Sequence, residues 1–130
     1  MSVRNHVRLK IITRSVTPEE ITARLGLNPD RVRRAGQPRP HTTIIENTNC
    51  WELHSGLPEH CELSEHISAV LRKVERCAKQ IAEMAEENEV LLSCIVHAPT
   101  EPALGLSKKI IRDLADICAE VDFDLYVGEE

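Results

Sequence analysis

Three segments of the chain alternate between apolar and polar residues, which is the pattern of a β-strand with one buried face. They span residues 6–13, 48–54 and 121–127, with apolar positions at Val7, Leu9 and Ile11, at Trp51 and Leu53, and at Phe123, Leu125 and Val127. A fourth segment, residues 90–97, is almost continuously apolar, as expected of a strand in the interior of a sheet. The pattern therefore predicts a sheet that contains these four strands.

Segments with helical periodicity separate these strands. Between residues 64 and 84, apolar residues recur at three- and four-residue spacings, which predicts one long amphipathic helix. A shorter helix begins after Thr17, a good N-cap followed by Pro18, and ends at Gly26. A further helix begins after Ser107 and carries Ile110, Ile111, Leu114, Ile117 and Cys118.

This order of elements favours an α+β fold, a two-layer sandwich with helices on one face of a mixed or antiparallel sheet. A single domain over residues 1–130 accounts for the whole length. The opposite sheet face would carry His6, Arg8, Lys10, Cys50, Glu52, His54, Asp122, Asp124 and Tyr126, with Leu91, Ser93, Ile95 and His97 between them. Such a face is suited to pair two copies, to bind a partner, or to be covered by the loop of residues 28–49.

That loop is rich in arginine. Prolines and Gly36 interrupt residues 28–49 so often that we predict a loop with one short strand. Its cationic residues are Arg31, Arg33, Arg34 and Arg39, with His41 beside them, and no acidic residue lies among them. Guanidinium groups bind carboxylates and phosphates bidentately, so the loop is a candidate site for an acidic protein, a phosphorylated ligand or an RNA segment. The alternative is that these arginines pair with glutamates of the same chain.

Several landmarks together resemble a bacterial domain-of-unknown-function family. They are Pro18-Glu19-Glu20-Ile21, Leu25-Gly26-Leu27-x-Pro29, Arg33-x-x-Gly36-x-Pro38, Trp51-x-Leu53-x-Ser55-Gly56, Leu106-Ser107 and Asp122-Phe123-Asp124-Leu125-Tyr126. The resemblance spans nearly the whole chain. It implies a small standalone α+β protein, ferredoxin-like in appearance, and it supplies no catalytic residues.

Composition narrows the classes of function. The net charge of -5 argues against a general nucleic-acid binder, which needs an excess of Lys and Arg. The chain shows neither the apolar stretch of a signal peptide nor a membrane-spanning run, so we expect a cytoplasmic protein that does not bind membranes. The five cysteines form no C-x-x-C pair, and we expect free, mostly buried thiols.

Two clusters suggest chemistry only weakly. His54, His60, Cys61 and His66 are donor types for zinc, but His60 and Cys61 are adjacent and would point apart. Asp122 and Asp124 lie two residues apart on one strand face, a spacing that also protects an edge strand from aggregation. No nucleophile elbow, P-loop or H-E-x-x-H motif occurs, so we expect no catalytic residues, no metal and no cofactor.

We therefore expect a non-enzymatic protein-binding or immunity-type module that uses the arginine-rich loop and the open sheet face, with a homodimer through that face possible. The predicted binding residues are Arg31, Arg33, Arg34, Arg39, His54 and Tyr126. A sensor of a small phosphate ligand, with Arg33, Arg34 and Arg39 on the anion and His54 or Tyr126 in the pocket, is the first alternative. A hydrolase or metal enzyme around His54, His60 and the aspartates is the second.

Overall fold

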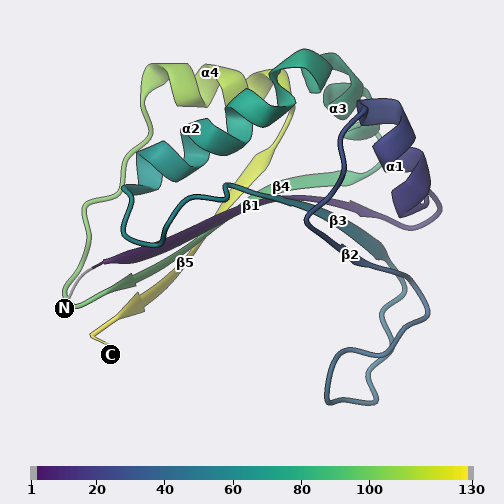
Figure 1. The fold of residues 1–130 in the computed structure, drawn as a ribbon, viewed down its shortest axis with the longest axis horizontal. Helices are drawn as coiled ribbons and strands as arrows, with labels where there is room; N and C mark the ends of the chain where they lie inside the picture. Colours follow the sequence, from purple (N-terminus) through teal and green to yellow (C-terminus); the bar gives the residue numbers. More distant parts are fainter. Residues whose placement is uncertain (1–2, 129–130) are drawn as a thin grey trace.

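The computed structural model describes residues 3–128. Over this range helices pack on one face of a sheet (Figure 1). The strands are β1 (Arg4–Thr13), β2 (Arg31–Arg33), β3 (Asn49–His54), β4 (Glu89–Ala98) and β5 (Glu120–Val127). The helices are α1 (Pro18–Leu25), α2 (Leu63–Val74), a 3₁₀ turn η1 (Glu75–Cys77), α3 (Ala78–Met84) and α4 (Lys108–Asp116). The predicted α+β sandwich is confirmed.

The strand order is β2-β3-β1-β4-β5. All neighbours are antiparallel except β4 and β5, which run parallel, so the sheet is mixed. The first four strands with α1 and α2 follow the split βαβ arrangement of ferredoxin-like domains. The segment from α4 to β5 adds one further strand at the β4 edge. The apolar strand, β4, is an interior strand as its composition predicts, and β1 lies in the middle.

The alternation along each strand sends one set of side chains into the core between sheet and helices. Val7, Leu9 and Ile11 of β1 are at most 2% exposed, and Trp51 of β3 is fully buried. The Trp51 Nε1 donates a hydrogen bond to the Thr22 hydroxyl of α1 at 3.1 Å. Trp51 is therefore a core residue that joins β3 to α1, and burying its indole removes the largest apolar side chain of the protein from water.

The first helix begins and ends where its sequence predicts. The Thr17 hydroxyl accepts a hydrogen bond from the Glu20 backbone at 3.2 Å, and Pro18 occupies the first turn. Gly26 ends the helix with φ 68°, a left-handed conformation in which a Cβ is unfavourable. These local rules place α1 on the sheet next to β3.

The predicted continuous helix over residues 64–84 is wrong in one respect. The 3₁₀ turn η1 separates α2 from α3, and Val74 just before it and Cys77 at its end depart from α-helical angles. Leu71, Val74 and Cys77 are all buried at three-residue steps, which match a 3₁₀ turn better than an α-helix. The tighter turn thus keeps three successive positions of the helical segment buried.

The face of the sheet opposite the helices is left uncovered by them (Figure 1). We call it the open face; its residues alternate with the core residues of the same strands. The register places Arg8 beside His54, Lys10 beside Glu52 and Leu91, and Ile95 beside Asp124. The loop after β2 leaves the sheet past the ends of β2 and β3 and extends away from the helices (Figure 1).

The two ends of the described chain leave the sheet at the same end. Arg4, near the start of β1, is paired with His97 of β4, and His97 is paired with Tyr126 of β5. The projecting loop lies at the far side of the molecule from both (Figure 1).

Candidate functional site

The projecting loop, residues 34–48, is a hairpin-like arm with its own hydrogen bonds; we call it the arm. The Gly36 backbone donates to the Glu46 carbonyl at 2.7 Å, and the Arg39 backbone donates to the Ile44 carbonyl at 2.8 Å. Pro38 and Ile45 form an isolated antiparallel bridge between its two sides. Gly36 has φ 87°, which a residue with a side chain rarely adopts, so the start of the arm depends on glycine.

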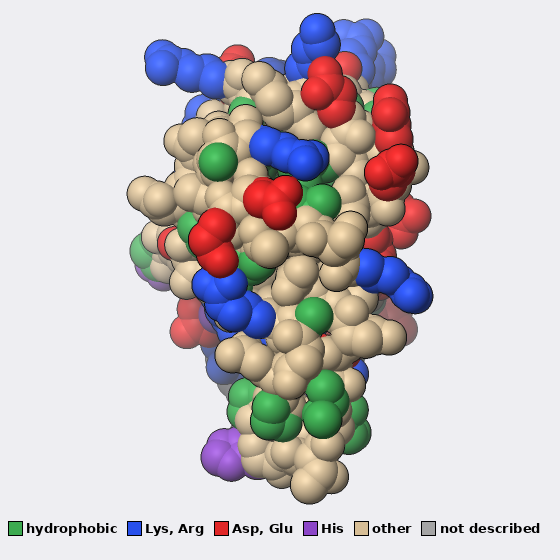
Figure 2. All heavy atoms as spheres, turned by 90° about the vertical axis from the view of Figure 1, so that its right-hand side faces the viewer, with side chains coloured by type: hydrophobic (Ala, Val, Ile, Leu, Met, Phe, Trp, Pro, Cys, Tyr) green, Lys and Arg blue, Asp and Glu red, His purple; other side chains and the backbone are tan. Residues whose placement is uncertain are grey.

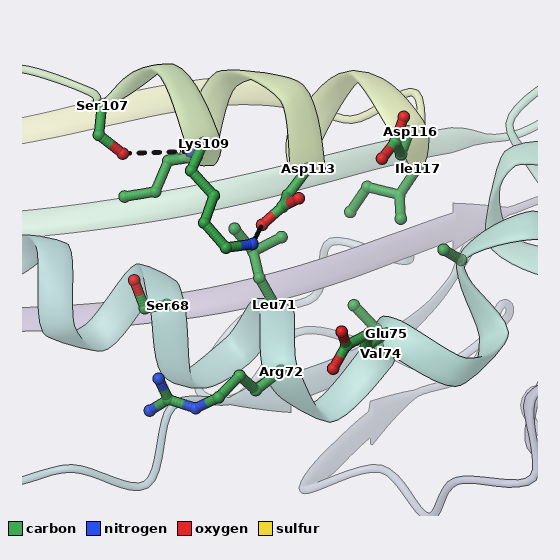
Figure 3. A pocket seen from close by; sticks show the side chains of 12 residues that line it. Ser68, Leu71, Arg72, Val74, Glu75, Ser107, Lys109, Asp113, Asp116 and Ile117 are labelled. Atoms are coloured by element: carbon green, nitrogen blue, oxygen red, sulfur yellow. Dashed lines mark hydrogen bonds and ion pairs between the residues drawn. The ribbon is translucent and has the colours of Figure 1, made fainter.

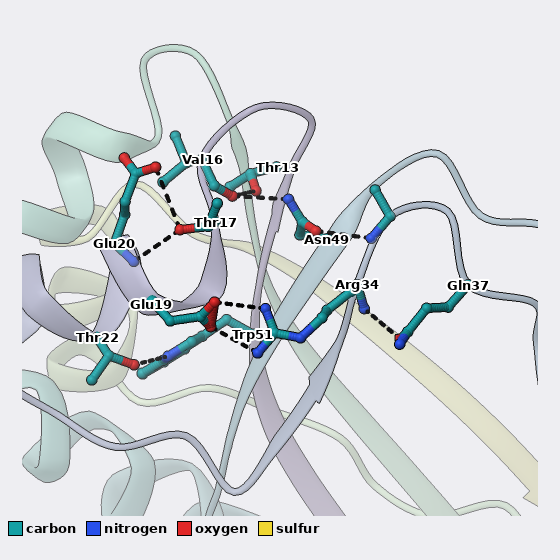
Figure 4. Close-up of polar contacts among 11 residues, drawn as sticks. Thr13, Val16, Thr17, Glu19, Glu20, Thr22, Arg34, Gln37, Asn49 and Trp51 are labelled. Carbon is teal, nitrogen blue, oxygen red and sulfur yellow. Dashed lines mark hydrogen bonds and ion pairs between the residues drawn. The ribbon is translucent and has the colours of Figure 1, made fainter.

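The base of the arm is tied to α1 (Figure 4). The two terminal nitrogens of Arg34 donate to the two carboxylate oxygens of Glu19 at 2.7 and 2.8 Å. The Asn49 side chain accepts from the Ala35 backbone at 2.8 Å and donates to the Val16 carbonyl at 3.0 Å. Arg34 holds the pKa of Glu19 below its usual value, mainly through the hydrogen bond. Planar bidentate pairing fixes direction as well as charge, so this contact orients the arm.

Two further arginines of the arginine-rich loop also bind within the protein. Arg39 forms an ion pair with Glu46 across the arm and lowers the pKa of Glu46. Arg33, on β2, donates to the Thr48 hydroxyl at 2.9 Å, while its buried Nε makes no hydrogen bond to the described residues. Arg31 makes no ion pair within residues 3–128. Pairing with the protein's own glutamates, the alternative considered for this loop, thus holds for Arg34 and Arg39.

The tip of the arm exposes apolar side chains. Ile44 is 53% and Ile45 65% exposed, and both lie on the side of the arm that follows His41. Figure 2 shows hydrophobic side chains gathered at the lower end of the molecule, which is the arm. A hollow there is lined by residues 38–44 alone, so it belongs to the arm and not to a pocket between arm and sheet. From the sequence, we predicted binding by the arginines of this loop and missed the two isoleucines. Two adjacent apolar residues in an otherwise polar loop were the signal that could have indicated an exposed apolar contact site.

On the open face, Glu52 lies among cationic side chains. Glu52 is only 7% exposed, and its carboxylate is 3.0 Å from the His54 Nε2 and 3.9 Å from a terminal nitrogen of Arg8. In the register it lies between Lys10 and Arg31. Partners on every side compensate for the burial of this carboxylate.

The six predicted binding residues do not converge on one point. Arg34 and Arg39 lie in the arm, Arg31 and Arg33 on β2, and His54 at the end of β3. Tyr126 lies on β5, at the opposite edge of the sheet, where its ring stacks on His97 with centroids 4.6 Å apart. The His54 backbone also accepts from Lys73 and donates to Asp30, each at 2.7 Å, which ties the end of β3 in place.

Sequence reasoning missed one buried polar pair. The Ser55 hydroxyl lies 2.7 Å from the His66 Nδ1, joining the loop after β3 to the first turns of α2, and His66 is 1% exposed. Burial lowers the pKa of His66, and the Pro58 carbonyl only partly opposes this. The other ring nitrogen makes no regular hydrogen bond within the described residues. Both side chains are buried, so the pair connects two elements rather than facing a substrate.

A groove of about 580 Å³ runs between α2 and α4 (Figure 3). Its apolar lining includes Leu71, Val74, Ile110 and Ile117. Lys109 and Asp113 form an ion pair of 2.7 Å on its rim. The groove is the seam between two helices that cover the same sheet, and none of the predicted site residues lines it.

The residues proposed for metal binding or catalysis are not assembled into a centre. Within residues 3–128, no group of three or more His, Cys, Asp or Glu side chains is arranged to hold a metal ion. Asp122 and Asp124 are exposed on the edge strand β5, and the Asp124 carboxylate accepts from the Tyr126 hydroxyl at 3.3 Å.

The five thiols are free, as predicted. Cys50, Cys77 and Cys94 are buried, and burial raises the pKa of Cys94 to about 12. Cys118, expected beside the apolar side of its helix, is exposed, because the chain turns out of α4 there with φ 53°.

The sequence matches the model of a known protein family. A model of a domain of unknown function, DUF4279, matches residues 3–128. The chain belongs to the DUF4279 family. Comparisons with curated proteins and with solved structures gave no match.

Membership of DUF4279 confirms the resemblance inferred from the landmarks. It assigns no specific activity, so a function for this DUF4279 protein has to be argued from its own surfaces. Within the described residues, no helix is long and apolar enough to cross a membrane.

Proposed function

We propose that this DUF4279 protein is a non-enzymatic binding module that recognises another protein through the arm. The observation that carries the proposal is the ordered arm with two adjacent isoleucines exposed at its tip. Exposed apolar side chains on an ordered projection are typical of protein contact sites. Burying one isoleucine in an interface contributes about 1.5–3 kcal/mol.

The contacts at the base of the arm support this role. The Arg34–Glu19 pair and the Asn49 hydrogen bonds hold the arm in one orientation before any partner arrives. A preorganised loop loses less conformational entropy on binding than a mobile one. The cost of ordering the arm is therefore already met in the free protein, and the arm presents a fixed shape.

The charge around the arm indicates the chemistry of the partner. Together with Glu19, the partner of Arg34, residues 31–48 hold four arginines and two glutamates, a net charge of +2, whereas the whole chain carries -5. A local positive field on an acidic protein steers negatively charged partners toward that region. We propose a partner with an apolar cleft and an acidic rim, as an immunity-type or accessory module would meet on the protein it regulates.

The test compares exposed isoleucines in two places. The double variant Ile44→Ser with Ile45→Ser should lose a partner that the wild type captures from its host, and should bind the purified partner about 100-fold more weakly or worse. The matched control is Ile111→Ser, since Ile111 on α4 is also 53% exposed. Equal capture and affinity for all three proteins would refute the arm as the binding site, and loss with Ile111→Ser alone would place the site on the helices.

A further inference from the structure

The ionic side chains of the open face are separated by strand. Its lysine and arginine residues within the described range lie on β1 and β2, namely Arg4, Arg8, Lys10, Arg31 and Arg33. Its exposed carboxylates lie on β4 and β5, namely Glu89, Glu120, Asp122 and Asp124. The other carboxylate of the face, Glu52, is buried against Arg8 and His54. One half of the face is therefore positive and the other half negative.

Apolar side chains lie between the two halves. Leu91 and Ile95 of β4 and Ile12 of β1 are half-buried on the open face, with no helix above them. An apolar patch with charged residues around it has the composition of an interface core and rim.

We infer that the open face binds a second copy of this chain. The two sheets pack face to face about a twofold axis that runs along the strands. Rotation about this axis reverses the strand order of one copy relative to the other, so the acidic β5 of each copy lies over the basic β2–β3 side of the other. The acidic edge strand of each copy then meets the basic edge strand of the other, and this contact occurs twice because the interface is the same patch on both copies. The middle strand β1 lies near its own copy.

The charge pattern also excludes the other twofold arrangement of two facing sheets. An axis across the strands would place every strand on its own copy, so β5 would lie on β5 and β2 on β2, which brings Asp122 and Asp124 of the two copies together. Like charges in that position oppose association, so the surface itself specifies the relative orientation. The inference uses residues of the sheet and none of the arm, and it stands independently of the proposed function.

Charge exchange tests the inference. Sedimentation equilibrium should show a dimer of the wild type that weakens between about 0.05 M and about 0.5 M salt. An acid-reversed protein, Asp122→Lys with Asp124→Lys, should dimerise at least about tenfold more weakly. A base-reversed protein, Lys10→Glu with Arg31→Glu, should behave likewise. An equimolar mixture of the two should again form dimers, now mixed ones, because the lysines introduced on β5 of one protein face the glutamates introduced on β1 and β2 of the other.

Two controls keep the outcome interpretable. Glu83→Lys with Asp116→Lys makes the same charge change as the acid-reversed protein but on the helix side, and it should dimerise like the wild type. Lys10 and Arg31 lie opposite Glu52, so circular dichroism melting checks folding, and Lys10→Gln with Arg31→Gln replaces the pair if the reversed protein unfolds. A monomeric wild type at low salt, or folded reversed variants that dimerise unchanged, would overturn the inference.

Discussion

His66 is a titratable side chain enclosed in the core beside Ser55. Because burial lowers its pKa, the folded protein holds the ring neutral at pH values where the unfolded chain, with the usual value of 6.5, already binds a proton. The unfolded state then binds more protons, so the free energy of unfolding rises with pH in the window from the lowered pKa up to about 6.5. Stability that His66 contributes as a neutral group is lost as the pH falls through this window.

The first prediction concerns the change of the free energy of unfolding with pH. His66→Asn should reduce the decline in the free energy of unfolding between neutral pH and mildly acidic pH, measured by urea titration at several pH values. His60→Asn, at an exposed histidine, should leave the decline as in the wild type. An unchanged slope in His66→Asn would mean that His66 titrates normally in the folded protein.

The role of a single residue can be predicted from the sequence where that role depends on residues close to it in the chain. Thr17, Pro18 and Gly26 bound α1 because capping and backbone conformation depend on neighbours in sequence. The Ser55–His66 and Arg34–Glu19 contacts join residues 11 and 15 apart, and no periodicity marks them. Such pairs follow from how the elements pack, which one sequence does not specify.

The arm is an element without a core of its own, held by its base. Replacing Arg34 by Gln removes the bidentate contact with Glu19, so amides of the arm such as that of Arg39 should exchange hydrogen faster, as measured by hydrogen–deuterium exchange. The global free energy of unfolding should change little, because the pair is exposed to solvent.

The matched control for this prediction is Arg24→Gln, which removes the exposed Arg24–Glu20 pair of α1. It should leave exchange in the arm unchanged. Equal exchange of the arm in the wild type and in Arg34→Gln would show that the backbone ladder alone orders the arm.

At the level of elements, the sequence predicts which segments form helices and strands because burial follows periods of two and of about three and a half residues. The same periodicity did not predict the 3₁₀ turn that divides the helical segment of residues 64–84. A three-residue step between core positions also fits one face of an α-helix over a short stretch, so the burial of Leu71, Val74 and Cys77 does not by itself reveal the 3₁₀ turn.

At the scale of the whole molecule, the five cysteines differ in exposure, so their reactivity reports which parts of the fold are buried. Cys118 is exposed and Cys61 partly so, whereas Cys50, Cys77 and Cys94 are buried. Burial raises the pKa of each of the three buried thiols, so thiolate, the reactive form, is scarce there.

A thiol reagent should therefore modify Cys118 quickly and Cys61 more slowly in the native protein. The three buried cysteines should react only through unfolding, slower by a factor on the order of 10³ or more, as followed by mass spectrometry. Cys118→Ser should remove the fast phase alone. Rapid native modification of Cys94 would contradict the position of β4 inside the sheet.

The fold class follows from the sequence because the alternation of helices and half-polar strands leaves few architectures open. The strand order cannot be predicted in this way, because the pairing of β1 with both β3 and β4 depends on contacts between segments that are distant in the sequence. The six predicted binding residues were chosen for their chemistry, and the sheet places Tyr126 and Arg31 on opposite edges.

The pairing of Arg4 with His97, and of His97 with Tyr126, has a practical consequence for engineering. Two strand spacings separate the first and last strands at that end of the sheet, roughly 10 Å. A short flexible linker can join the two ends of the described range there, and new ends can be opened at the tip of the arm. Such a circular permutant would keep the sheet intact while cutting the arm in two.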